Sequence, residues 1–124
     1  MKARLIIPGQ LPGLNDYIEA ERAHRQRGAR LKREAQGLVL LAIRRQLREV
    51  RFTRPVHMRY LWVERSRRRD KDNVSAFGRK VIQDALVAAK VLQNDGWAHV
   101  EGFTDAFDVD KKKPRIEVEI SDEV

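Results

Sequence analysis

The residues with the clearest chemical potential lie in one short segment, residues 67–73, which reads Arg-Arg-Arg-Asp-Lys-Asp-Asn. The segment follows residues 56–63, which alternate like a strand, and precedes residues 74–89, which have helical periodicity. If the extended backbone of the strand persists, Asp70 and Asp72 project to one side, about 7 Å apart. Two such carboxylates can hold Mg²⁺, a hard cation that keeps several waters and shares its remaining positions with a phosphate. The segment therefore predicts a magnesium site beside phosphate-binding arginines.

The same residues also have plainer interpretations. Asp-x-Asp pairs arise by chance in chains of this length, and a second pair, Asp108 and Asp110, has no supporting context. Asp70 and Asp72 could be a solvated pair that neutralises the neighbouring arginines, or part of a loop that caps a helix. Asn73 lies at or near the expected N-cap, where the positive end of a helix attracts phosphate. These alternatives remain open on this segment alone.

Two further charged positions follow at helical or turn spacing. Lys80 lies seven residues after Asn73, so two helical turns place both on one face. Lys80 could stabilise charge that develops on a scissile phosphate, or it could form an i,i+4 ion pair with Asp84. Asp95 lies in an Asn-Asp-Gly turn, where it is either a third ion-binding carboxylate or an ordinary turn residue.

The elements that must position these residues alternate between strand and helix patterns. Four segments are expected to be strands: 3–8, 56–63, 99–109 and 115–120. Two are expected to be amphipathic helices, one from about Arg30 to Leu47 and one over residues 74–89. Residues 9–29 are expected to form a long loop, and residues 111–114 a hairpin-like connection. The order β-α-β-α-β-β predicts a single small α+β domain over residues 1–124, with two main helices on one face of a mixed sheet.

Charge is unevenly distributed along the 124 residues, whose formal net charge is +8. Residues 21–55 contain eleven Lys and Arg against three Asp and Glu, whereas acidic residues predominate between positions 84 and 110. Arg30 and Arg33 lie mostly off the apolar stripe of their helix. Because this face is too one-signed for i,i+4 salt bridges, phosphate contact is a better interpretation than a merely solvated face. The charge pattern favours a nucleic acid as the partner.

Composition excludes several other classes of protein. The chain has no cysteine, which rules out disulfide scaffolds, thiolate zinc sites and cysteine nucleophiles. No apolar run approaches the roughly 18 residues that a membrane helix requires, and the N-terminal apolar stretch is too short for a secretory signal. A cytoplasmic protein without a membrane partner is expected. Trp62 and Trp97 are expected in a core or an interface rather than as base-stacking platforms.

Several of these residues together resemble the RusA-like Holliday junction resolvases of bacteria and their phages. The central match comprises residues 69–73, then Lys80 four positions before Asp84-Ala85-Leu86, then Asp95 eleven positions after Asp84. Residues 11–17 also resemble the family's early Pro-x-x-Asn-x-Tyr element, and the element order agrees over most of the chain. One departure is a longer spacing of six residues between Asn73 and Lys80, which makes Arg79 an alternative to Lys80.

The resemblance implies a small, homodimeric, Mg²⁺-dependent endodeoxyribonuclease that resolves four-way DNA junctions by paired symmetric nicks, in DNA recombination and repair. By position, it implies that Asp70, Asp72 and Asp95 bind the metal and that Lys80 is catalytic. The residues expected to contact DNA are Arg67, Arg68, Arg69, Lys71, Asn73, Arg79, Arg30 and Arg33. Two alternatives stay open: a non-catalytic nucleic-acid-binding module, and a metal-dependent nuclease that acts on other branched DNA.

Overall fold

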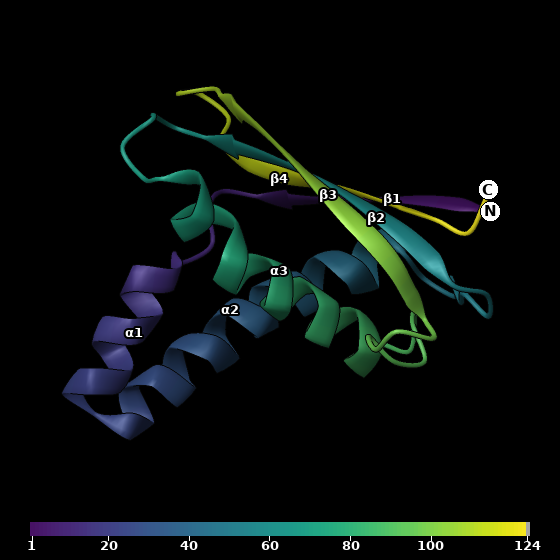
Figure 1. Cartoon of the computed structure of the whole chain (residues 1–124), viewed down its shortest axis with the longest axis horizontal. Coiled ribbons are helices and arrows are strands. Elements are labelled where there is room, and N and C mark those ends of the chain that lie inside the picture. The colour runs from purple at the N-terminus through teal and green to yellow at the C-terminus, as the bar shows by residue number, and fades with distance from the viewer. Residues whose placement is uncertain (124) are drawn as a thin grey trace.

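All four strands expected from alternating apolar residues are present, each within one residue of its expected bounds, together with three helices (Figure 1). The structure is a computed structural model that describes residues 1–123. In chain order the elements are β1 (Lys2–Pro8), α1 (Leu14–Ala23), α2 (Arg25–Gln46), β2 (Val56–Glu64), α3 (Lys71–Ala88), β3 (Val100–Val109) and β4 (Arg115–Ser121). The fold class is α+β, as the sequence predicts.

The four strands form one mixed sheet in the order β1-β4-β2-β3. β2 and β3 are parallel neighbours, which requires a long crossover between them, and α3 provides it. β4 runs antiparallel to both β1 and β2. The expectation of a hairpin-like connection at residues 111–114 is therefore wrong, because β2 lies between β3 and β4 and these two consecutive strands never pair.

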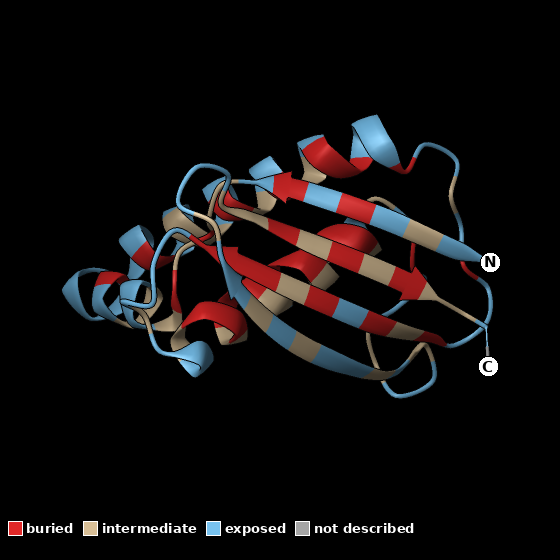
Figure 2. Ribbon diagram, turned by 90° about the horizontal axis from the view of Figure 1, so that it is seen from above, coloured by how far each residue is buried: buried red, intermediate tan, exposed pale blue. Residues whose placement is uncertain are grey.

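The helices lie on one face of the sheet, and the core fills the space between the two layers (Figure 1). Buried and less buried residues alternate along the two central strands (Figure 2). The expected inward-facing residues are buried: Val56, Met58, Tyr60 and Trp62 of β2, and Ile116, Val118 and Ile120 of β4. They pack against apolar residues of α2 and α3, among them Val39, Ile43, Val81 and Ile82.

The region expected to be a long loop contains a third helix, α1, which packs against α2 and α3, so the two helices that cover the sheet are α2 and α3, as expected (Figure 1). α1 begins after Gly13, whose backbone N–H donates to the Asp16 carboxylate at 2.8 Å, which is one of the two hydrogen bonds of a capping box. His24 is extended and separates α1 from α2, and its Nδ1 accepts a hydrogen bond from Gln26 N at 3.1 Å. Ala20 is the one fully buried residue of α1, and Leu14, Tyr17 and Ile18 are half-buried on its apolar side. The observed order is β-α-α-β-α-β-β.

The outer edge of β1 is occupied by a side chain from the end of α2. The Gln46 amide donates to the Ile6 carbonyl and accepts from the Ile6 N–H, both at 2.7 Å. One glutamine thus satisfies both backbone groups of a strand residue. None of the helices among the described residues has the length and apolar character needed to cross a membrane.

Close contact between α3 and the sheet depends on a glycine. A Cβ built on Gly78 would lie 2.9 Å from Cζ3 of Trp62, whose side chain is buried as expected. The Trp62 ring is also held at its other end, because its indole N–H donates to Asp105 at 2.9 Å. Trp97, in contrast, is fully exposed rather than part of the core.

Two glycine-to-alanine substitutions should therefore have opposite effects. Gly37→Ala in α2, where no heavy atom lies within 4 Å of the added Cβ, should raise the free energy of unfolding by about 0.5–1 kcal/mol. Gly78→Ala should lower it by about 1–2 kcal/mol, because the immobile Trp62 ring leaves no room for the methyl group. Urea denaturation of both variants measures this, and stabilisation by Gly78→Ala would show that the ring is free to shift.

Candidate functional site

The segment 67–73 lies at the edge of the sheet where the parallel strands β2 and β3 reach their carboxyl ends. Asp70 is the N-cap of α3, with extended φ and ψ of −65° and 153°, and the helix begins at Lys71. The expectation that Asp70 and Asp72 share one side of an extended chain is therefore wrong, because Asp72 belongs to the first turn of the helix. Asn73 lies inside this turn rather than at its N-cap. Acidic groups are favoured at these positions, since they face the positive end of the helix.

Asp70 and Asp72 are exposed, and their carboxylates have no partner among residues 1–123. The Asp70 side chain makes no capping hydrogen bond, although the residue occupies the N-cap position. The neighbouring cation Arg69 pairs with Glu64 and approaches Asp16 instead. The oxygens of both carboxylates are consequently free to accept an incoming cation.

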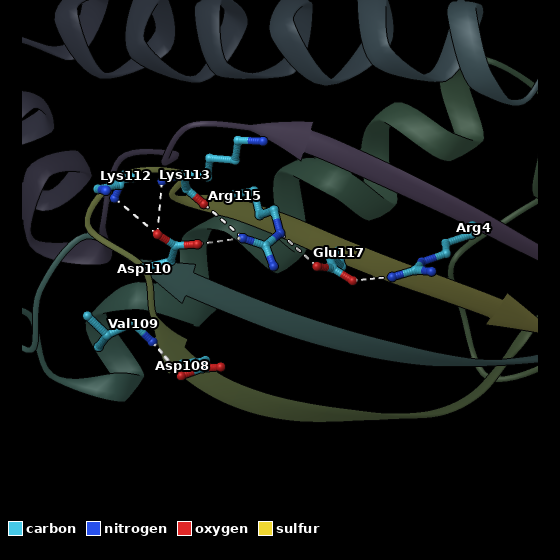
Figure 3. A network of polar contacts seen from close by, with 8 residues as sticks. All are labelled: Arg4, Asp108, Val109, Asp110, Lys112, Lys113, Arg115 and Glu117. Carbon is cyan, nitrogen blue, oxygen red and sulfur yellow. Dashed lines mark hydrogen bonds and ion pairs between the residues drawn. The ribbon is translucent and has the colours of Figure 1, made fainter.

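The second Asp-x-Asp pair, Asp108 and Asp110, is used for local structure (Figure 3). Asp108 accepts a hydrogen bond from the next backbone amide at 2.8 Å. One oxygen of Asp110 accepts from Lys113 N at 3.1 Å and Lys112 N at 3.0 Å, and the other lies 3.4 Å from Arg115. The amide hydrogen bonds from Lys113 and Lys112 are the main reason that the pKa of Asp110 is lowered. This pair therefore orders the connection between β3 and β4, a role that Asp70 and Asp72 lack.

Arg69 anchors the segment 67–73 to β2 and to the N-terminal part of the chain. Its Nε and Nη2 donate to the two carboxylate oxygens of Glu64, both at 2.9 Å, and its Nη1 donates to the Leu11 carbonyl at 3.1 Å. Glu64 is buried, because position 64 continues the inward-facing alternation of β2. That alternation is the sequence signal from which the burial of Glu64, and its need for a cation, could have been predicted. Arg69 was expected to contact DNA. In the structure its guanidinium instead forms hydrogen bonds with Glu64 and Leu11 of the protein itself.

Asn73 connects the same segment to the N-terminal motif. Its side-chain oxygen accepts a hydrogen bond from Asn15 N at 2.8 Å. A Cβ built on Gly13 would lie 2.6 Å from that oxygen, so this approach requires glycine. One turn further along each helix, the rings of Tyr17 and Phe77 stack with centroids 4.8 Å apart. The two motifs that carry the family resemblance thus lie against each other.

Arg79 belongs to a different network, directed toward β3. Its guanidinium lies 2.7 Å from Asp105 and 4.3 Å from the centroid of the Phe103 ring. Asp105 also accepts the Trp62 hydrogen bond, so one carboxylate joins α3, β2 and β3. The sequence alone did not predict this role of Asp105.

Lys80 lies between two carboxylates. Its ammonium is 3.0 Å from Asp84 and 3.2 Å from Asp95, and the hydrogen bonds to Asp84 and then Asp95 raise the pKa of Lys80. Lys32 of α2 also reaches Asp84, at 3.4 Å. The i,i+4 pair expected as the plainer interpretation of Lys80 is present.

Asp95 is consequently held near the middle of α3, while Asp70 and Asp72 lie at its beginning. Eight residues of helix separate Asp72 from Lys80, which corresponds to a rise of about 12 Å. Among residues 1–123 there is no group of three His, Cys, Asp or Glu side chains with the arrangement of a metal site. The structure thus brings Asp95 to Lys80, and does not bring Asp70, Asp72 and Asp95 into one cluster.

The other basic residues of the segment face solvent around a cavity. Arg67, Arg68 and Lys71 are exposed, as are Arg30 and Arg33 on the outer side of α2. A cavity of about 460 Å³, here called the α3 cavity, opens between the end of β2, the start of α3 and the end of β3. It is lined by Glu64, Ser66, Arg67, Arg69, Asp70, Lys71, Val74, Phe107, Asp108 and Val109.

Comparison with known proteins gives no match: the chain fits no protein-family model, and no curated protein matches its sequence. The functional argument therefore depends on the residues and on the geometry described above.

Arg69 and Arg67 should differ in their effect on stability, although they are two positions apart. Arg69→Ala should lower the free energy of unfolding by about 2 kcal/mol, since it leaves the buried Glu64 carboxylate without its cation. Arg67→Ala should change it by less than about 0.5 kcal/mol, because Arg67 is exposed. Urea denaturation of the two variants tests this. Equal effects would mean that the Glu64 pair contributes nothing to the fold.

Acid should weaken the fold through the network at the end of the sheet. Hydrogen bonds from Arg115, at 2.7 Å, and from Arg4 lower the pKa of Glu117. A lowered pKa means that this contribution to stability is complete above the unfolded value, near 4.5, and is lost as pH falls through the folded value.

Glu117→Gln should therefore flatten the acid limb of the stability profile. The urea midpoint, followed from about pH 6 to about pH 3, measures the effect. Glu119→Gln, the same change on the same strand outside this network, serves as the control and should keep the wild-type slope. Identical acid limbs for all three proteins would contradict the assignment to Glu117.

Proposed function

We propose that this protein is a Mg²⁺-dependent, RusA-like endodeoxyribonuclease that resolves four-way DNA junctions by paired nicks. The observation that carries the proposal is the pair Asp70 and Asp72, two exposed carboxylates without a partner among residues 1–123, at the start of α3. The second Asp-x-Asp pair of the same chain, Asp108 and Asp110, differs in that both carboxylates accept backbone hydrogen bonds. The resemblance of residues 69–73 to the resolvase motif supports the same assignment.

The donor set fits a hard divalent cation such as Mg²⁺ better than it fits a thiolate-bound metal. The chain has no cysteine, and the candidate ligands are carboxylate oxygens, which suit a hard cation. Mg²⁺ is commonly bound by one or two carboxylates, with waters and substrate phosphates in the remaining positions, so two are sufficient. Mg²⁺ held by Asp70 and Asp72 would supply an activated water and a polarised phosphoryl oxygen.

The remaining residues of the proposal bind and orient DNA. Arg67, Arg68 and Lys71 surround the two carboxylates as exposed cations, which can neutralise the phosphates on either side of the cut. Arg30 and Arg33 would extend this contact along α2. A homodimer would place two such sites about a two-fold axis, as paired symmetric nicks require. A bacterial enzyme with this substrate, as the resemblance implies, would act in the cytoplasm.

A second candidate is a nucleic-acid-binding module without cleavage. The specific observation in its favour is the ion pair of Lys80 with Asp95, two residues that the resemblance assigns to catalysis. On this hypothesis, both residues stabilise α3 and its following turn, and the basic surface alone is functional. A nuclease specific for other branched DNA is the third hypothesis, and a panel of flaps, forks and junctions separates it from the first.

Cleavage of a labelled synthetic four-way junction tests the proposal. We expect symmetric, ligatable nicks with Mg²⁺ and none with EDTA, because the attacking water is activated by the ion. Asp72→Asn and Asp70→Asn should each reduce the cleavage rate by at least about 100-fold, because each removes a charged ligand.

Asp110→Asn provides the matched control, since it makes the same change in the second Asp-x-Asp pair. It should leave the cleavage rate at the wild-type level. Junction binding that is indifferent to Mg²⁺ and never leads to cleavage would instead identify the non-catalytic module. Asp95→Asn on the same substrate assigns the third carboxylate: a loss as large as that of Asp72→Asn places it with the ion-binding residues, and retained cleavage leaves it as the partner of Lys80.

A further inference from the structure

The α3 cavity lies directly beside Asp70 and contains more than the proposed ion site requires. Asp70 and Lys71 contribute to its wall, but so do Val74, Phe107 and Val109. Val74 is buried, Phe107 packs partly against the core, and Val109 is exposed. A phosphate group alone has no use for an apolar surface, so these residues point to a ligand with an apolar part.

The cavity contains an aromatic ring with the exposed side chain of Lys71 over its face, and a base that stacks there would displace this lysine. The Lys71 ammonium lies 5.5 Å from the centroid of the Phe107 ring, and the exposed Arg67 lines the same cavity. An aromatic side chain stacks on any nucleobase, because every base has a π face, while lysine and arginine contact the attached phosphate. These are the two halves of a nucleotide.

The charges that line the cavity are balanced. Glu64 and Arg69 neutralise each other through their bidentate contact, which leaves Asp70 and Asp108 against Arg67 and Lys71. A cavity designed for a bare phosphate would carry a positive excess. A balanced, partly apolar cavity of about 460 Å³ has the character of a site for a neutral ring with polar edges.

We infer that the α3 cavity receives a single unstacked nucleobase of branched DNA, which stacks on Phe107 beside the phosphate to be cut. This inference rests on the proposed function and names the part of the substrate that the site recognises. A base in continuous duplex is paired and stacked on both faces, and its removal costs a few kcal/mol, whereas a branch point interrupts the continuous stack and lowers the part of this cost that comes from stacking. The cavity would thus provide selectivity for branched over linear DNA.

Pairing a protein change with a DNA change tests the inference. Phe107→Leu removes the π face and retains an apolar side chain, and an abasic residue at each branch nucleotide in turn removes the base. Affinity for the junction is measured with Ca²⁺ in place of Mg²⁺. At one nucleotide, we expect each change alone to weaken binding about tenfold, and both together to weaken it no further.

Phe103→Leu is the matched control, because Phe103 lies on the same strand, outside the cavity, and contacts Arg79. It should leave affinity unchanged at every junction, and equal urea midpoints for the two variants would exclude a folding defect. Wild-type cleavage of junctions together with unchanged affinity of Phe107→Leu would overturn the inference and leave the proposed function intact. If Phe107→Leu and the abasic residue weakened binding additively at every branch nucleotide, the inference would also be overturned and the proposed function would stand. Failure of the wild-type protein to bind or cut junctions would overturn both.

Discussion

The bidentate contact between Arg69 and Glu64 is the interaction on which the candidate site depends. A carboxylate at an inward-facing position would be costly to bury alone, and the guanidinium satisfies both of its oxygens at 2.9 Å. The same guanidinium reaches the Leu11 carbonyl, so a single side chain joins β2, the start of α3 and the N-terminal segment. Asp70 follows Arg69 immediately, and its carboxylate is exposed.

The strands were predictable, whereas most partners of the charged residues were not, and the i,i+4 pair of Lys80 with Asp84 is the exception. Alternation along β2 and β4 identifies their buried faces because one side of each strand must leave water. α1 has apolar residues at helical spacing, Leu14, Tyr17 and Ile18, but it has only ten residues, and the Gly and Pro residues that precede it favour a loop. Among three consecutive arginines, spacing does not say which one turns inward. That choice depends on Glu64 and on Leu11, which lies 58 residues away in the sequence.

Motif spacing and geometry give different information about the acidic residues. Asp70 with Asp72 and Asp108 with Asp110 are identical patterns, and only the backbone around them separates them. Asp110 accepts two amide hydrogen bonds from the turn that follows it, whereas Asp70 caps a helix with its backbone and leaves its carboxylate unused. The charged residues that make up the net charge of +8 also differ in this way. Some charges hold elements together, as Arg79 and Lys80 do, and others face solvent around the α3 cavity.

The two outer strands of the described sheet are protected by different means, and this affects how the molecule behaves when it is concentrated. An exposed strand edge is a template to which another chain can add, which leads to fibrillar aggregation. At β1, the Gln46 amide already occupies the backbone groups of Ile6. At β3, Glu101 and Asp108 are exposed, and a second copy of the strand in antiparallel register would bring like charges together. Sheet growth is thus opposed at one edge by a hydrogen-bonded side chain and at the other by charge repulsion, and the repulsion weakens as the salt concentration rises.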